Sequence, residues 1–280
     1  MARNEDTDTR KTYRLSRSRA SVSAGVAMIL LTFGGAGSPA QAKEEPDLTG
    51  VWTLYLEPGQ NAMSAFAMQA PELPLTAEGK KRSDEYKKLL GPEAANPGTY
   101  CVAYGMPTMM EMAGAYPIEF IQKPDQVTII YEVEGETRRV YLGARNLAPE
   151  DRIPSRQGYS SGHWEGNTLV VETDSLTDGE DQIIHPRSDQ AKIVERFTLT
   201  KDAKGTRIID YTMTMTDPVY YTQPVTSKRK WMPLPDGHII DYNCSEEAWL
   251  KLLDLRRKQL RDGVPVTATM KDAFDYLPNQ

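Results

Sequence analysis

The sequence predicts a mainly β protein in which an antiparallel meander closes, or nearly closes, into a barrel. Three observations predict this fold: nine or ten segments with the two-residue alternation of strands follow one another, short turn signals separate them, and helical patterns occur only at the flanks. A meander of this many strands removes its exposed edges most simply by closing on itself. A β-sandwich satisfies the same pattern and is the alternative.

The first 42 residues have the pattern of a secretory signal peptide. Five basic residues between Arg10 and Arg19 precede an apolar stretch that ends near Phe33, and Ala40-Gln41-Ala42 has the A-x-A form of a cleavage site. We therefore expect residues 1–42 to be removed and residues 43–280 to form a single barrel domain in the periplasm or outside the cell. An uncleaved membrane anchor is the alternative, although the apolar stretch is short for a span.

The charge and hydropathy of the mature chain argue against a nucleic-acid partner and against a membrane span. Residues 1–42 contain six basic and three acidic residues, so the mature chain keeps 27 basic and 36 acidic ones, a net charge of −9. No basic stripe remains to neutralise phosphates, so we expect no nucleic-acid partner. No later apolar run approaches the length of a membrane span, so we expect none in the mature chain.

Cys101 and Cys244 are the two cysteines of the chain, and export would carry both to an oxidising compartment. We expect a disulfide between them, which would close a loop of about 140 residues and contribute about 5 kcal/mol in the chain-entropy model. The alternative is that the two cysteines are free thiols or bind a metal together, although they lack the C-x-x-C spacing that is typical of metal sites.

The elements follow in order along the mature chain. A strand over residues 47–56 comes first, and a helix over residues 76–90 begins at Thr76 as N-cap and ends before Gly91-Pro92. Strands are then expected at residues 118–122, 126–133, 138–142, 160–165, 168–173, 191–200, 206–216, 225–232 and 238–243.

A second helix is predicted over residues 245–262, with Ser245 as its cap and Gly263 after its end. Its apolar stripe should pack against the sheet, and consists of Trp249, Leu252, Leu253 and Leu260.

The hairpin over residues 160–173 contains the first candidate site. His163 and Glu165 are two residues apart and share one face of a strand. A carboxylate that is hydrogen-bonded to an imidazole raises the pKa of the imidazole and fixes its tautomer, which suits acid–base catalysis. Trp164 lies between them. The alternative is that His163 and Trp164 only hold the hairpin together.

A carboxylate lies on an apolar strand face farther along the chain. Alternation places Glu195 with Ile193 and Phe197, where it must be paired or kept neutral. It is either a site residue or the partner of an inward arginine, Arg138 or Arg139. On the next strand, one face carries large apolar side chains that suit either a ligand cavity or a packed core: Ile209, Tyr211, Met213 and Met215.

Two metal hypotheses remain beside an expectation of no cofactor. His185 precedes the Glu195 strand and could join His163 and Glu195 as a zinc site, although no H-x-H or H-x-x-x-H spacing supports it. A methionine cluster could bind Cu(I) or could be an apolar plug near the barrel mouth, and comprises Met106, Met109, Met110 and Met112.

Two resemblances to known families accompany these patterns. Leu48-Thr49-Gly50-Val51-Trp52 resembles the G-x-W first strand of calycins, the lipocalin and avidin group of ligand-binding barrels, which implies a lipocalin-like barrel. Gly105-Met106-Pro107, Gly162–Thr173 and Glu195-Arg196-Phe197 resemble segments that recur in this order in a family of exported bacterial proteins. That family usually has Asp at the position of Asn167 and often Arg at that of Thr108, and it implies no reaction.

Three functional hypotheses follow. The first is an exported barrel that binds a small hydrophobic or aromatic molecule, with Trp164, Tyr211, Met213 and Met215 lining its cavity. The second is a cofactor-free lyase, isomerase or hydrolase in which His163 acts with Glu165, His185 or Glu195. The third is a protein that handles copper or zinc.

Overall fold

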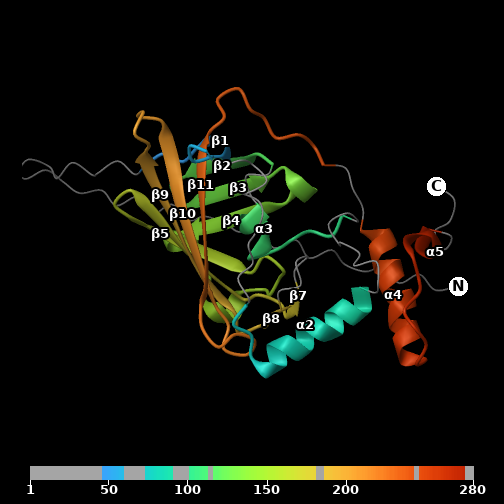
Figure 1. Ribbon diagram of the computed structural model, residues 1–280. Helices are drawn as coiled ribbons and strands as arrows, with labels where there is room; N and C mark the ends of the chain where they lie inside the picture. Colours follow the sequence, from blue (N-terminus) through green and yellow to red (C-terminus); the bar gives the residue numbers. More distant parts are fainter. Residues whose placement is uncertain are drawn as a thin grey trace, which may run out of the picture. The chain divides into compact units, whose positions relative to one another are not determined.

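The computed structural model describes residues 46–59, 73–90, 101–112, 116–180, 186–242 and 246–274 (Figure 1). The main strands are β1 Gly50–Leu54, β2 Ile118–Lys123, β3 Gln126–Tyr131, β4 Thr137–Leu142, β5 Tyr159–Glu165, β6 Thr168–Asp174, β9 Lys192–Lys201, β10 Arg207–Thr216 and β11 Val225–Pro233. They close into one barrel in the order β1-β11-β10-β9-β6-β5-β4-β3-β2. The prediction of a mainly β barrel with flanking helices is confirmed, and the sandwich is excluded.

Shorter elements surround the barrel. They are the ribbon of β7 Gly179–Glu180 and β8 Pro186–Arg187, the helices α2 Ala77–Leu90, α3 Thr108–Met112, α4 Glu247–Arg261 and α5 Met270–Phe274, and 3₁₀ turns at Val133–Gly135, Gly143–Arg145 and Pro149–Asp151. The prediction of a strand over 238–243 is wrong for residues 238–242, which form none. Because β1 pairs with both β11 and β2, the barrel has no free edge for another strand.

One neighbouring pair departs from the antiparallel pattern. β4 and β5 run parallel, from the Val140–Ser160 pair to the Leu142–Gly162 pair. Nine strands cannot alternate in direction around a closed ring because nine is odd, so at least one pair must be parallel. Residues 143–158 carry the chain from the end of β4 back to the start of β5, which makes this the parallel pair.

Aromatic side chains fill much of the barrel interior. Trp52, Phe120, Phe197, Tyr211 and Trp231 are each at most 1% exposed. The ring centroids of Phe197 and Tyr211 are 4.8 Å apart, and those of Tyr211 and Trp231 are 4.9 Å apart. These separations lie in the range of favourable aromatic pairs, so the interior is a packed aromatic core at this level.

The predicted first strand brings its tryptophan into that core. Trp52 Nε1 donates to the carbonyl of Leu48 at 2.9 Å. The guanidinium of Arg207, at the start of β10, lies over the Trp52 ring at 5.3 Å from its centroid. These contacts fix the residues before β1 against the barrel, because the indole uses both its N–H and its π face.

The methionine segment forms an apolar plug in the same core. Met106, Met109 and Met110 are at most 2% exposed and belong to the cluster that contains the barrel aromatics. Arg229 on β11 donates to the carbonyl of Glu111 in α3 through Nε at 3.2 Å and Nη2 at 3.1 Å. The burial of these three methionines favours the plug interpretation over a copper site, and the side chain of Met112 lies outside the described part of the chain.

The N-terminal helix begins as predicted. Thr76 Oγ1 accepts a hydrogen bond from the backbone N–H of Gly79 at 3.0 Å, which satisfies one of the unpaired donors of the first turn of α2. The predicted cap of α4, Ser245, lies outside the described residues. Within those residues, no helix has the length and hydrophobicity that crossing a bilayer requires.

The apolar stripe of α4 packs on helices, which corrects the prediction that it packs on the sheet. Trp249, Leu252 and Leu253 join residues of α2 and α5 in a second hydrophobic cluster, with Leu90 and Ala273. Leu260 is 44% exposed. The buried stripe continues instead through Arg256, whose Nε donates to the carbonyl of Ala268 at 2.9 Å. Because this hydrogen bond satisfies the guanidinium, the aliphatic part of the arginine side chain can pack as an apolar chain.

Candidate functional site

The predicted β5–β6 hairpin is present. Glu165 pairs with Thr168, so the loop consists of Gly166 and Asn167. Gly166 has a φ of +64°, which glycine adopts without steric cost. Asn167 Nδ2 donates to the carbonyl of Leu199 on β9 at 2.9 Å, which ties the turn to the neighbouring strand.

His163 and Glu165 form the predicted pair on the outer face of this hairpin. His163 Nε2 lies 3.3 Å from Glu165 Oε1, and Arg196 on β9 donates to Glu165 Oε2 at 2.7 Å. The hydrogen bond from Arg196, followed by that from His163, lowers the pKa of Glu165. The His163 side chain is 57% exposed, so this group of three is an open surface feature.

Glu195 lies on the opposite face of the sheet from His163. In the register of the barrel, His163 is paired with Val170, whereas Glu195 is paired with the next residue, Val171. Successive residues of a strand point to opposite sides, so His163 faces outward and Glu195 inward. The expectation that Glu195 acts as the counterpart of His163 is therefore corrected. His185 lies outside the described residues, and its position stays a prediction.

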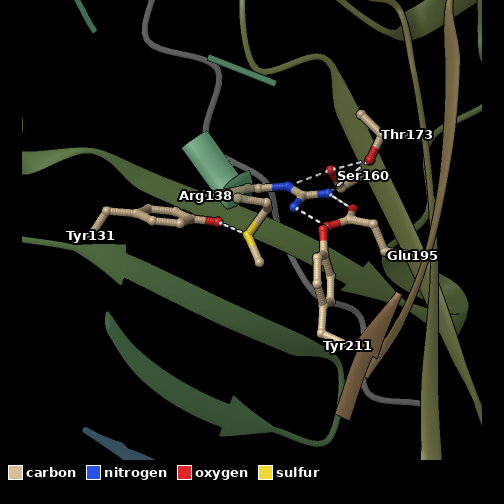
Figure 2. Close-up of polar contacts among 7 residues, drawn as sticks. Tyr131, Arg138, Ser160, Thr173, Glu195 and Tyr211 are labelled. Atoms are coloured by element: carbon tan, nitrogen blue, oxygen red, sulfur yellow. Dashed lines mark hydrogen bonds and ion pairs between the residues drawn. The ribbon is translucent and has the colours of Figure 1, made fainter. Parts of the chain in front are cut away.

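Inside the barrel, Glu195 forms an ion pair with Arg138, as one of the two sequence interpretations predicted. Figure 2 shows the Arg138 guanidinium between this carboxylate and two hydroxyls. Arg138 Nη1 donates to Glu195 Oε1 at 3.0 Å, and Nη2 donates to Oε2. Arg138 Nε donates to Ser160 Oγ at 3.0 Å, and Nη2 also donates to Thr173 Oγ1 at 2.8 Å. The pair is almost fully buried, at 2% and 0% exposure.

Two tyrosines complete this buried polar cluster. Tyr211 Oη donates to Glu195 Oε1 at 2.8 Å, and Tyr131 Oη donates to Met110 Sδ at 2.8 Å. Burial, and next the charge of Glu195, raises the pKa of Tyr211 well above its ordinary value. Burial is the largest single influence on Arg138 and acts to lower its pKa, but the charge and hydrogen bonds of Glu195 together with the two tyrosines outweigh it and raise that pKa. The groups satisfy one another, so the cluster joins six strands, β3, β4, β5, β6, β9 and β10, and is a structural tie.

The predicted ligand wall lies inside the barrel. Tyr211, Met213 and Met215 are at most 5% exposed and belong to the main core cluster, and Trp164 packs against that cluster. The indole Nε1 of Trp164 is buried and has no hydrogen-bond partner among the residues that the structure describes. The burial and ring contacts of Tyr211 favour the packed-core interpretation of this wall.

Two other predicted sites depend on residues outside the described ranges. Cys244 is one of them, so its disulfide with Cys101 stays a prediction, as does any metal site that includes His185. Among the described residues, no group of three His, Cys, Asp or Glu side chains is placed to hold a metal ion.

A pocket that no single sequence segment reveals lies between α2, α4 and the loops beside β7 and β8. We call it the aromatic pocket. Its volume is about 220 Å³. Its apolar wall consists of Tyr86, Val102, Tyr104, Trp249, Leu250 and Leu253. Its polar wall consists of Arg156, Thr177, Asp178, Arg187, Glu246 and Arg257.

The side chains at the back of the aromatic pocket are firmly held. Trp249 and Arg187 are each 2% exposed. Arg187 Nε donates to the carbonyl of Thr177 at 3.0 Å, and Nη1 donates to the carbonyl of Met106. Asp178 accepts from Tyr220 Oη at 2.8 Å and from Arg82 at 2.9 Å. The pocket therefore has a preformed wall, as ligand sites commonly do.

A second space, the polar pocket, adjoins the aromatic pocket. Its volume is about 470 Å³, and it is lined by Cys101, Ala103, Glu136, Ser155, Arg156, Gln157 and Glu246. Three residues line both spaces: Ala103, Arg156 and Glu246. Gln157 Nε2 donates to Glu136 Oε1 at 3.0 Å, and burial is the main cause that raises the pKa of Glu136.

Comparisons with known proteins add no assignment. No family model matches the chain, and a search of curated proteins found no match. From its fold and pockets, the protein is a closed nine-stranded β-barrel with an adjoining pocket that aromatic, apolar and charged side chains line.

Proposed function

We propose that the protein is exported and binds a small hydrophobic or aromatic molecule in the aromatic pocket. The observation that carries this proposal is that Trp249, at 2% exposure, still lines an open space of about 220 Å³. Leu250, which is 49% exposed, offers apolar surface beside this indole, and Arg156 provides a polar group for orientation. Apolar walls with a few polar groups are typical of small-molecule sites.

The pocket is a better place for the ligand than the barrel interior. Phe197, Tyr211 and Trp231 fill the interior with close ring contacts, and the plug of Met109 and Met110 packs against them. A ligand there would have to displace packed side chains, which costs contacts on every side. The aromatic pocket needs no such displacement.

Export is the second part of the proposal and rests on the sequence. The basic segment, the apolar stretch and Ala40-Gln41-Ala42 support transport to the periplasm or beyond. Leu48, close behind that site, is fully buried.

Binding of N-phenyl-1-naphthylamine, a neutral dye that fluoresces in apolar surroundings, tests the ligand proposal. We expect wild-type protein to bind the dye and Trp249→Ala to weaken binding about tenfold or more, because a central aromatic contact is lost. Leu260→Ala is the matched control, since Leu260 is on the same helix but 44% exposed. Ala103→Trp, which fills the pocket and removes no contact, should also abolish binding.

A variant in the barrel distinguishes the alternative location. Trp164→Phe changes the predicted barrel wall and should leave dye affinity unchanged. A loss of affinity in Trp164→Phe, with Trp249→Ala folded and unaffected, would place the ligand in the barrel and overturn the proposed site. Absence of dye binding by the folded wild-type protein, together with no small molecule in an organic extract of purified protein, would overturn the function.

Acid–base catalysis is the alternative function, and the hydrogen bond between His163 and Glu165 is the observation in its favour. The pair lies on an open face with Arg196, so a substrate would have to bind at the barrel surface. Turnover that disappears in His163→Ala while the melting temperature is unchanged would support it.

A further inference from the structure

We propose that the polar pocket is a separate site for a small primary amine, whose ammonium group pairs with the carboxylate of Glu136. The pocket has a volume of about 470 Å³, which is ample for such a ligand. Three side chains of its lining carry hydrogen-bond acceptors: Glu136, Gln157 and Ser155. Binding here goes beyond the proposed function and needs no ligand in the aromatic pocket.

Glu136 is half-buried and lacks a direct countercharge. Its Oε1 accepts from Gln157 Nε2 at 3.0 Å, and its Oε2 accepts from the backbone N–H of Gly105 at 3.4 Å, so both donors are uncharged. Among the described residues, no cationic side chain forms an ion pair with this carboxylate. Burial is the largest influence on Glu136 and raises its pKa, and the hydrogen bonds and the charge of Arg156 offset this only in part. A bound cation supplies the compensation that such a carboxylate requires.

The arginine that lines the pocket is engaged by other groups. Arg156 Nη1 donates to the carbonyl of Ala103 at 2.9 Å, and its Nη2 lies 3.7 Å from Glu246 Oε2. The lining therefore has two carboxylates, Glu136 and Glu246, and one guanidinium, a formal charge of −1. This surplus attracts a cationic ligand and repels an anionic one.

Backbone hydrogen bonds hold the acceptors of the pocket in place. The N–H of Tyr131 on β3 donates to the carbonyl of Glu136 at 2.9 Å, which fixes Glu136 directly before β4. The N–H of Ser155 donates to the carbonyl of Ser175 at 3.0 Å, and the N–H of Gly158 donates to the carbonyl of Ser155 at 3.1 Å, which closes a turn. Because the walls are formed without a ligand, less entropy is lost on binding.

The acceptors that remain match N–H donors. Within the described part of the chain, Gln157 Oε1 accepts no hydrogen bond, and Ser155 Oγ keeps its lone pairs after it donates to the carbonyl of Gly158 at 3.3 Å. A primary ammonium has three N–H donors, and these two oxygens and the Glu136 carboxylate can accept them.

Two other kinds of cation fit the lining less well. A quaternary amine has no N–H and is recognised by aromatic faces, and no aromatic side chain of the described residues lines this pocket. Ca²⁺ takes about six to eight oxygen ligands, several of them carboxylates, and the guanidinium of Arg156 would repel a double positive charge.

Titration of ¹⁵N-labelled protein with propylammonium, followed by NMR at about pH 7, tests this site. Two groups that donate to the Glu136 carboxylate report on it: the backbone N–H of Gly105 and the side-chain amide of Gln157. We expect both signals to shift with saturation, and the Kd to be about tenfold or more below those of propan-1-ol and tetramethylammonium. Acetate and Ca²⁺ should produce no saturable shift.

Two charge variants should change the affinity for propylammonium in opposite directions. Glu136→Gln keeps the shape and one acceptor oxygen but removes the charge, and should weaken binding about tenfold or more. Arg156→Met removes the opposing positive charge and should tighten binding about threefold. Glu172→Gln, at an exposed position of β6, is the matched control and should leave the affinity unchanged.

Several results would overturn the ammonium site and leave the proposed function standing. They are equal affinity for propan-1-ol, tighter binding of Ca²⁺ or acetate, no saturable shift, and unchanged affinity in Glu136→Gln. Shifts that gather at Trp249 and Leu250 would place the amine in the aromatic pocket instead. If Glu136→Gln does not fold, Arg156→Met decides, and an affinity that is unchanged or weaker overturns the site. Absence of dye binding bears on the proposed function alone.

Discussion

Arg138 on β4 and Glu195 on β9 form a two-point ion pair inside the barrel, with 3.0 Å between Nη1 and Oε1 and a second contact between Nη2 and Oε2. Two strands, β5 and β6, lie between them in the barrel order. Each contributes a hydroxyl, from Ser160 and Thr173, that accepts a hydrogen bond from Arg138. The pair therefore connects four neighbouring strands through one guanidinium.

Breaking this pair should destabilise the protein strongly. Glu195→Gln leaves a buried guanidinium without its countercharge, and we expect a loss of about 3–5 kcal/mol in the free energy of unfolding, measured by urea denaturation. Arg139→Met is the control, because Arg139 is exposed on the same strand and should change stability by less than about 0.5 kcal/mol.

The double variant Arg138→Met/Glu195→Leu should recover most of that loss, since no charge remains buried. Losses that simply add in the double variant would show that the two side chains do not act as a pair.

Truncation of two neighbouring residues in the hairpin, His163 and Trp164, should destabilise the protein to very different extents. His163→Ala removes a half-exposed side chain and should change the free energy of unfolding by less than about 0.5 kcal/mol. Trp164→Ala removes a side chain that packs against the main core and should cost about 3 kcal/mol. Thermal melts of both variants measure this contrast, and a larger loss for His163→Ala would mean that His163 holds the hairpin.

Stability should depend on pH through Glu136. Its pKa in the folded protein lies above the ordinary 4.5, so the folded state binds the proton more tightly than the unfolded chain. Wild-type protein therefore loses stability, relative to Glu136→Gln, as the pH rises from about 4 through the raised pKa. Melting temperatures of both proteins at several pH values between 4 and 7 check this. A difference that is constant across the series would contradict the raised pKa.

A disulfide between Cys101 and Cys244 should leave no free thiol in the mature protein. We expect an Ellman assay in denaturant to give no signal until a reductant is added. Reduction should lower stability by up to about 5 kcal/mol, the value for a loop of about 140 residues. Two reactive thiols in the unreduced, unfolded protein would contradict the pairing. Cys101→Ser/Cys244→Ser is the control for direct effects of the reductant.

Cleavage after Ala42 should place Lys43 at the N-terminus of exported protein. Intact mass and N-terminal sequencing of protein from the periplasmic fraction measure this. Ala40→Arg/Ala42→Arg should block processing, because the A-x-A site requires small residues. Full-length wild-type protein in the membrane fraction would instead support the uncleaved anchor.

Alternation along single strands was sufficient to predict part of the interior. It placed Glu195 inward and offered Arg138 or Arg139 as its partner, because a buried carboxylate needs a countercharge wherever the fold puts it, and the structure selects Arg138. It also placed His163 and Glu165 on one face. These are properties of one strand, and they need no knowledge of its neighbours.

Features that depend on several distant segments were beyond such reasoning. The aromatic pocket combines side chains from α2, α4, the segment around Tyr104 and the loop around Arg156, and no local pattern relates them. The packing of α4 was assigned to the sheet because an apolar stripe shows that a helix is buried and not what buries it. The prediction of a strand at 238–243 was wrong because β1 pairs with both β11 and β2 and leaves no place in the barrel for a further strand, and this closure is a property of the whole barrel.

The pairing of β1 with β11 sets the order in which a growing chain can fold. Trp52 is paired with Pro233, so the ring closes only after about 180 further residues have been added. A chain that ends before β11 has two open strand edges, on β1 and on β10, each able to pair with another chain. Until β11 is synthesised, a growing chain can therefore form at most an open sheet.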